Sequence, residues 1–73
     1  MIPAKAAFDR FVQKTGINNH VAFYIYDATM PATLVDLQVV DPMITRADYY
    51  RAVCELEDQL LIRQIGRGYV RAR

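Results

Sequence analysis

The sequence of 73 residues contains no serine, a single histidine and a single cysteine. Without serine no Ser-His-Asp triad can form, and His20 and Cys54 cannot supply the ligand set of a structural zinc site. A Cys54–His20 dyad stays open, although an isolated cysteine is more often a small buried apolar residue. We therefore expect a protein that is not an enzyme and that carries neither a metal nor a cofactor.

Long hydrophobic runs and glycine-rich loops are also missing. No apolar run reaches the ~20 residues needed to span a bilayer, and the N-terminus lacks the apolar region of a signal peptide. The three glycines, Gly16, Gly66 and Gly68, form neither a P-loop nor a dinucleotide fingerprint. A lone cysteine forms no internal disulfide and suits a reducing compartment. We expect a cytoplasmic protein with no membrane contact.

Hydrophobic residues make up 53% of the chain and charged residues 23%, which is ordinary for a globular domain. A chain of this size buries only ~60% of the surface that its unfolded form exposes, so it has little stability to spare. No linker-like stretch divides the sequence. We therefore predict a single domain over residues 1–73.

The net charge of +1 hides a difference between the two parts of the chain. Residues 1–45 carry three basic and four acidic side chains, whereas residues 46–73 carry six arginines and four acids. The last eleven residues contain four arginines and no acid. Guanidinium groups match phosphate geometry, so this segment suits an anionic partner; a merely solvated basic tail is the alternative.

Two helices are indicated by apolar residues at three- and four-residue intervals. The first covers residues 1–16, from Pro3 to about Lys14, and Gly16 follows as its stop. Its Phe8 and Phe11 either complete the core or form a dimer face. The second covers about residues 45–59, with Thr45 as N-cap. Its predicted buried stripe is Tyr49, Ala52, Val53, Leu56 and Leu60.

Between these helices, two segments are ambiguous. Residues 21–26 and 33–40 show helical spacing and have candidate N-caps in Asn18 or Asn19 and in Thr33, but they are also rich in strand-forming residues. If both are helices, residues 17–59 form a helical motif. If they pair as strands, the chain is α-β-β-α with a short tail.

Residues 60–73 are predicted to form a β-hairpin. Leu61–Ile65 and Tyr69–Arg73 are strand-like, and the three residues Gly66–Gly68 between them form the predicted loop. Arg67 then stands at the tip, and alternation puts Arg71 and Arg73 on one face. The fold class is therefore mostly α with a C-terminal β-hairpin.

The order of these elements resembles a winged helix-turn-helix domain of the type found in small bacterial, phage and plasmid regulators and replication proteins. Thr45 stands at the start of the family's recognition helix, and Leu61-Ile62 and Gly66-Arg67-Gly68 resemble its wing. The resemblance implies about four helices plus a two-stranded wing. This chain departs from the pattern with Leu60 in place of a glycine and with Asp41-Pro42 in the interhelical turn.

The resemblance further implies double-stranded DNA as the partner. Arg46, Ala47, Tyr50 and Arg51 would face the major groove, where arginine can pair with guanine. Thr45 would bind a phosphate through its hydroxyl and backbone amide. Arg67 would lie by the minor groove, and the remaining wing arginines, Arg63, Arg71 and Arg73, would bind phosphates. Asp48 argues against this interface because it should repel the phosphate backbone. It would either accept from a cytosine amine or, as we favour, pair with Arg51 along the helix.

Two functions follow from these observations. The first is a non-catalytic DNA-binding regulator, or an excision or replication factor of a mobile element, which acts by occupying its site. The second is a protein-interaction module or a small inhibitor of host machinery, because a net charge of +1 is modest for a DNA binder. Its docking surface would be an exposed apolar patch around Phe8 and Phe11. A homodimer through the N-terminal helix is compatible with either function.

Overall fold

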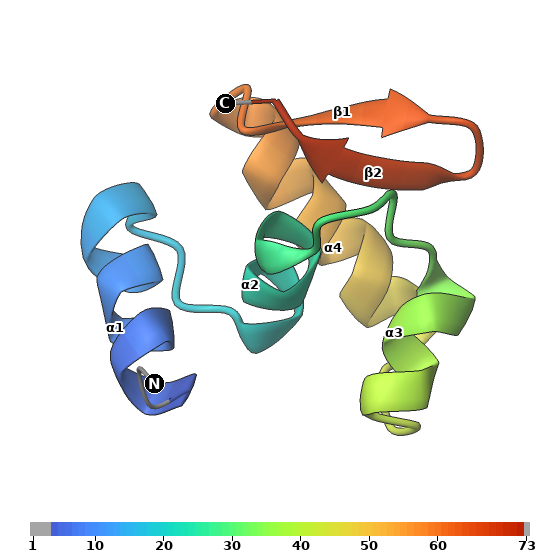
Figure 1. Ribbon diagram of the computed structural model, residues 1–73, viewed down its shortest axis with the longest axis horizontal. Helices are drawn as coiled ribbons and strands as arrows, with labels where there is room; N and C mark the ends of the chain where they lie inside the picture. Colours follow the sequence, from blue (N-terminus) through green and yellow to red (C-terminus); the bar gives the residue numbers. More distant parts are fainter. Residues whose placement is uncertain (1–3, 73) are drawn as a thin grey trace.

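The computed structural model describes residues 4–72, in which four helices precede a C-terminal hairpin (Figure 1). The elements in chain order are α1 (Ala4–Thr15), α2 (His20–Asp27), α3 (Leu34–Val40), α4 (Arg46–Asp58), β1 (Ile62–Ile65) and β2 (Gly68–Arg71). The predicted layout, mostly helical with a C-terminal hairpin, is confirmed. Both ambiguous segments lie in helices, which excludes the α-β-β-α alternative. No helix in residues 4–72 has the length and apolar character needed to cross a membrane.

The helix starts explain why segments rich in β-branched residues become helical. The Asn19 side-chain oxygen accepts hydrogen bonds from the backbone N–H groups of Val21 and Ala22, at 2.9 and 3.4 Å, at the start of α2. Thr33 and Thr45 each open a helix with a reciprocal capping box. These bonds satisfy N–H groups that a helix leaves unpaired at its first turn, and so they favour helix over strand.

The core gathers around α2, which lies between α1 and α4 (Figure 1). Ile25 of α2 and Leu56 of α4 have no exposed surface, and Phe11 of α1 is 4% exposed. Phe8 is half-buried and stacks on the ring of His20, with 3.8 Å between the ring centroids. The predicted apolar docking patch around Phe8 and Phe11 is therefore wrong. Both rings pack inside the chain because α1 completes the core.

Strands β1 and β2 pair in antiparallel register, with Ile62 opposite Arg71 and Ile65 opposite Gly68. The turn therefore has two residues, Gly66 and Arg67, rather than the predicted three. Gly66 has φ +60°, as expected at the first position of a two-residue hairpin turn.

The hairpin is also joined to the segment that leads into α3. The backbone of Tyr69 exchanges two hydrogen bonds with that of Ala32, at 2.8 and 3.1 Å. A Cβ atom on Gly68 would lie 3.0 Å from the carbonyl carbon of Pro31, closer than real Cβ atoms ordinarily approach backbone. Glycine at this position therefore allows β2 to come near residues 31–32.

The predicted buried stripe of α4 fails at its last member. Tyr49, Ala52, Val53 and Leu56 are buried, but Leu60 is 67% exposed. The helix ends at Asp58, and Leu60 takes the left-handed conformation, with φ +57°. Helical spacing no longer applies beyond that point. Leu60 adopts the backbone conformation for which glycine is the usual choice after a helix.

Candidate nucleic-acid interface

The outward face of α4 carries the residues that the sequence predicts for the major groove. Arg46, Ala47, Tyr50 and Arg51 are all exposed, and Cys54 follows one turn later. The opposite face supplies core residues, so packing fixes the orientation of the helix. Tyr50 is 51% exposed and its ring lies edge-on to the buried Tyr49. The end of this face is acidic, since Glu57 and Asp58 are also exposed.

Thr45 is exposed, but its backbone amide is already engaged. That N–H donates to Asp48 Oδ2 at 2.9 Å, and the Asp48 N–H donates to Thr45 Oγ1 at 3.1 Å. Only the hydroxyl proton of Thr45 is left for a phosphate, which corrects the prediction of an amide contact. The bonds from Thr45 hold the pKa of Asp48 below its ordinary value, and the charge of Arg51 contributes least. The main role of Asp48 is therefore to cap α4, and its interaction with Arg51 is secondary.

Arg51 lies beside a polar hollow between the start of α2 and α4. Asn19, His20, Asp48 and Glu55 line it as well. The Asn19 amide donates to Glu55 Oε1 at 3.1 Å, which ties the two helices together. The carboxylates of Asp48 and Glu55 reduce the positive potential at Arg51. No group of three metal-ligating side chains occurs in the described part of the chain.

The hairpin arginines divide into two kinds. Arg63 and Arg67 are exposed, and Arg67 is in the turn. Arg71 instead packs on α2: its Nε donates to the Tyr26 carbonyl at 2.9 Å, and its guanidinium lies 4.1 Å from the centre of the Tyr26 ring. Its terminal nitrogen is 3.8 Å from Asp27 Oδ1. Arg71 therefore anchors the hairpin while its side chain is still 40% exposed, so the phosphate contact predicted for it stays a prediction; Arg73 lies outside the described residues.

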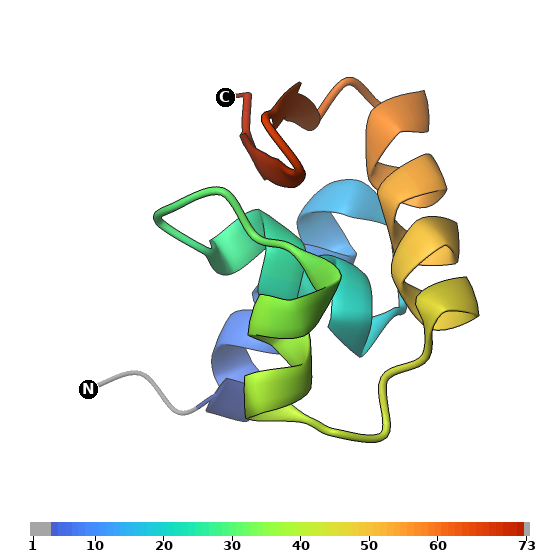
Figure 2. The ribbon, with the colours of Figure 1, turned by 90° about the vertical axis from the view of Figure 1, so that its right-hand side faces the viewer.

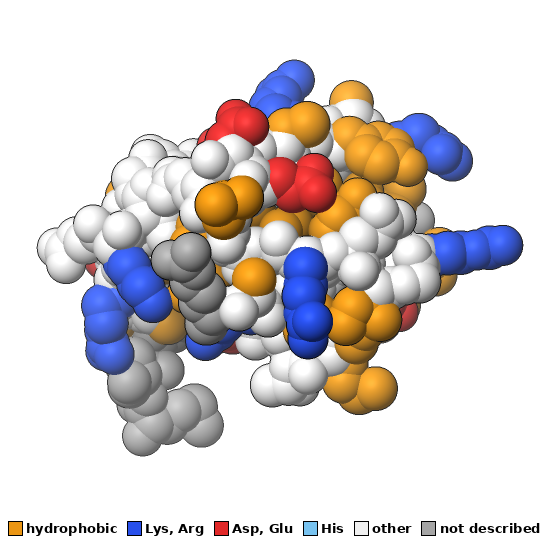
Figure 3. All heavy atoms as spheres, turned by 90° about the horizontal axis from the view of Figure 1, so that it is seen from above, with side chains coloured by type: hydrophobic (Ala, Val, Ile, Leu, Met, Phe, Trp, Pro, Cys, Tyr) orange, Lys and Arg blue, Asp and Glu red, His pale blue; other side chains and the backbone are white. Residues whose placement is uncertain are grey.

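In Figure 1 the hairpin turn projects to the right, above the N-terminal half of α4, and α3 lies to the right of that half. When this right-hand side faces the viewer, α3 stands in front, α4 to its right and the hairpin above (Figure 2). From above, two of the Lys and Arg side chains adjoin at one edge and the others stand apart, with acidic and apolar side chains among them (Figure 3). This face therefore presents separate cations rather than one continuous basic patch.

An aromatic cluster joins α4 to the hairpin. Tyr49 and Tyr69 meet edge to face, 6.3 Å between centroids, and the Tyr49 hydroxyl donates to the Ala32 carbonyl at 2.9 Å. Burial raises the pKa of Tyr49 to about 12, so this hydroxyl keeps its proton. Burial also raises the pKa of Tyr69. The cluster fixes the angle between α4 and the hairpin, and it leaves Tyr50 as the exposed aromatic group.

Comparisons with protein-family models, with curated proteins and with solved structures find no match for this chain. The functional argument therefore rests on the geometry of the chain itself.

Proposed function

We propose that the chain is a winged helix-turn-helix DNA-binding domain that acts without catalysis, as a small transcription regulator or as an excision or replication factor of a phage, plasmid or other mobile element. Helix α4 would enter the major groove, and the hairpin would contact phosphates or the minor groove. A helix with its side chains is ~10–12 Å across, close to the ~12 Å width of the major groove.

One observation carries this proposal: the first half of α4 carries exposed arginines, and the hairpin joined to α4 by the Tyr49–Tyr69 contact carries exposed arginines and no acid. Arg46 and Arg51 belong to the helix, and Arg63 and Arg67 to the hairpin. Arginine on a helix suits base reading, and arginine on a hairpin suits phosphate or minor-groove contact. Tyr50 can add a phosphate hydrogen bond or pack on a thymine methyl group.

A second candidate function, a protein-interaction module or small inhibitor without DNA binding, is favoured by α3. This helix exposes Val35, Val39 and Val40 at 69, 82 and 64%. Residues 15–45 contain no lysine or arginine, so α3 and its surroundings offer no cation to a phosphate backbone. The cations for a DNA contact near α3 would therefore have to come from α4 and the hairpin.

Fluorescence anisotropy with a labelled random duplex tests the proposal. We expect binding at low salt that weakens tenfold or more at moderate salt, because each neutralised phosphate releases counterions. Arg67→Ala should lower the salt slope by about one if Arg67 binds a phosphate. Arg46→Ala or Arg51→Ala should cost about 1–3 kcal/mol on a selected site.

Arg10→Ala provides the matched control, because Arg10 is an exposed arginine on α1, outside the proposed interface. It should leave affinity and salt slope unchanged. Absence of binding at low salt by folded protein would overturn the proposal and leave the interaction module. An effect of Arg10→Ala equal to that of Arg67→Ala would show nonspecific charge attraction instead.

A further inference from the structure

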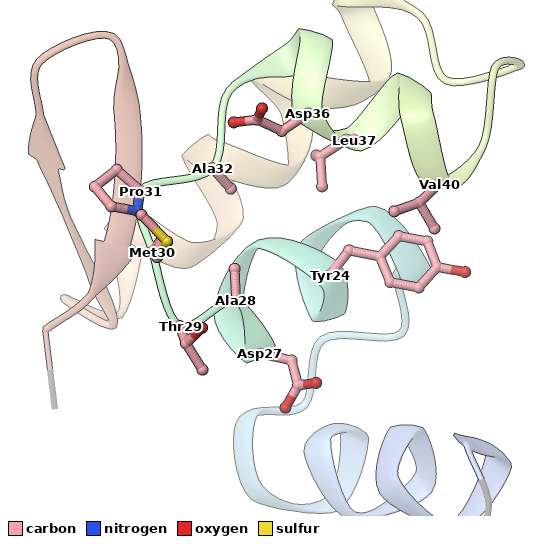
Figure 4. Close-up of a pocket in the computed structure, with 10 residues that line it drawn as sticks. All are labelled: Tyr24, Asp27, Ala28, Thr29, Met30, Pro31, Ala32, Asp36, Leu37 and Val40. Atoms are coloured by element: carbon pink, nitrogen blue, oxygen red, sulfur yellow. The ribbon is translucent and has the colours of Figure 1, made fainter.

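A groove runs between α2 and α3, on a part of the molecule that the proposed DNA interface does not use (Figure 4). Its lining is mainly apolar and comes from both helices and from the segment between them: Tyr24, Ala28, Met30, Pro31, Leu37 and Val40. Met30 is 73% exposed and Val40 is 64% exposed. An open groove with exposed apolar side chains is the kind of surface on which a partner gains binding energy.

The charges at this groove have one sign. Asp27 lines it from α2 and Asp36 from α3, whereas no Lys or Arg of residues 4–72 lines it. Bonds from Thr33 hold the pKa of Asp36 below its ordinary value, so this carboxylate is ionised at neutral pH. Asp27 has a 66% exposed side chain and lies 3.8 Å from Arg71, which reaches it from the hairpin. The groove therefore presents apolar surface with an acidic rim, at which Arg71 offsets part of the charge of Asp27 and Asp36 has no such partner among residues 4–72.

The walls also restrict the shape of the partner. Both are helices, whose central backbone groups bond within the helix, so the groove offers no free strand edge for an added β-strand. The longer wall, α2, has 8 residues. At ~1.5 Å per residue a groove of this length accommodates about two turns of a partner helix. Side-chain packing, rather than backbone pairing, would supply the contacts.

We propose that the α2–α3 groove is the docking site for a basic amphipathic helix of a partner protein. Apolar side chains of that helix at i, i+3 or i+4, and i+7 would fill the groove, and Lys or Arg beside them would face Asp27 and Asp36. A second copy of this chain fits less well, because a symmetric contact would bring like-charged rims together. The proposal does not depend on DNA binding.

The test is an NMR titration of the full ¹⁵N-labelled chain with two helical peptides of about 14 residues. Both peptides have the same leucine stripe; one carries lysines beside it and the other glutamates. We expect saturable shifts at the groove residues with the lysine peptide and an affinity at least about tenfold lower for the glutamate peptide. Equal affinities, or no binding of either peptide, would overturn the proposal.

Two variants that place opposite charges at the same position make the test sharper. Val40→Lys should weaken binding of the lysine peptide about tenfold, whereas Val40→Glu, which removes the same apolar group, should weaken it less than about threefold. Leu60→Lys is the control, because Leu60 is 67% exposed, similar to Val40, and lies beyond the end of α4. It should leave affinity unchanged. If Val40→Lys does not fold, Met30→Lys replaces it.

Two further outcomes would assign the groove to another occupant. Concentration-dependent shifts at the groove without peptide, together with a dimer mass in sedimentation equilibrium, would identify a second copy and overturn the proposal. Groove shifts on adding a DNA duplex would assign this face to nucleic acid. Val40→Lys should leave the affinity for a DNA duplex within about twofold of the original. Failure of the groove proposal can therefore be distinguished from failure of the proposed DNA-binding function.

Discussion

Helices α3 and α4 begin in the same way and then differ. Each starts at a threonine whose hydroxyl accepts from the N–H of an aspartate three residues later, while that aspartate accepts from the threonine N–H. In α4, Tyr49, Ala52, Val53 and Leu56 are buried and arginine and tyrosine side chains face solvent; in α3 only Leu37 is buried, and valines face solvent. Identical starts therefore do not determine which side chains the outward face of a helix exposes.

The two helices should differ most in the stability that is lost when the buried leucine of each is replaced by alanine. Leu56 has no exposed surface and lies in the main helical contact, whereas Leu37 is 4% exposed at the edge of the core. We expect Leu56→Ala to cost about 4 kcal/mol and Leu37→Ala about 2 kcal/mol of unfolding free energy, because α3 can relax into the smaller cavity. Urea unfolding measures both, and equal losses would contradict this ranking.

Loss of the threonine hydroxyl should lower the free energy of unfolding equally for the two capping boxes, because their geometries match. The Thr33 and Thr45 hydroxyls accept at 3.2 and 3.1 Å, and their N–H groups donate at 3.0 and 2.9 Å. Thr33→Ala and Thr45→Ala should each cost about 1 kcal/mol. Hydrogen exchange in the variants would show where the loss falls, with α3 opening locally and α4 held by the core.

The same boxes set a pH dependence. Hydrogen bonds from Thr33 and Thr45 lower the folded-state pKa of Asp36 and Asp48 from 3.8. A lowered folded pKa means that the stabilisation is fully present above about pH 4 and is lost as the pH falls through the folded value. Asp36→Asn with Asp48→Asn should flatten the stability curve below pH 4; an unchanged curve would mean that other carboxylates dominate.

The smallest change in stability is expected from substitutions just after the last residues of α3 and α4. Leu60 after α4 has φ +57°, whereas Asp41 after α3 has φ −144°. Leu60→Gly should stabilise the protein by up to about 1 kcal/mol, because left-handed backbone strains a side-chain-bearing residue. Asp41→Gly should destabilise it, since Asp41 Oδ1 accepts from the Met43 N–H at 3.0 Å. Thermal unfolding distinguishes a gain from a loss.

Most of the fold was predictable from local signals. The predicted helix over 45–59 occurs at Arg46–Asp58 with Thr45 as its cap, and Asn19 and Thr33 do cap the two ambiguous segments. Periodicity could not decide those segments because valine and tyrosine suit either structure. The cap bonds decided them, together with the packing of α2 against α4 and of α3 against α2. The prediction for Leu60 failed because helical spacing was extended past the end of the helix.

The candidate site was less predictable because contacts distant in sequence decide which arginines stay free. Arg71 binds a carbonyl 45 residues earlier, and no local pattern indicates that pairing. The role of Asp48, in contrast, was readable: threonine followed three residues later by an acid is a capping signature. The exposed valines of α3 were present in the sequence as well, but the ambiguity between helix and strand over residues 33–40 left undetermined which side chains would be exposed.

The hydrogen bonds of Ala32 affect how the molecule unfolds. Its carbonyl accepts from the Tyr69 N–H and the Tyr49 hydroxyl, and its own N–H donates to the Tyr69 carbonyl. A free two-stranded hairpin is marginally stable in water, but this one is bonded to the approach to α3 and, through Tyr49, to α4. The hairpin therefore belongs to the cooperative unfolding unit of the helices, and the amides of Ala32 and Tyr69 should exchange with solvent only when that whole unit opens.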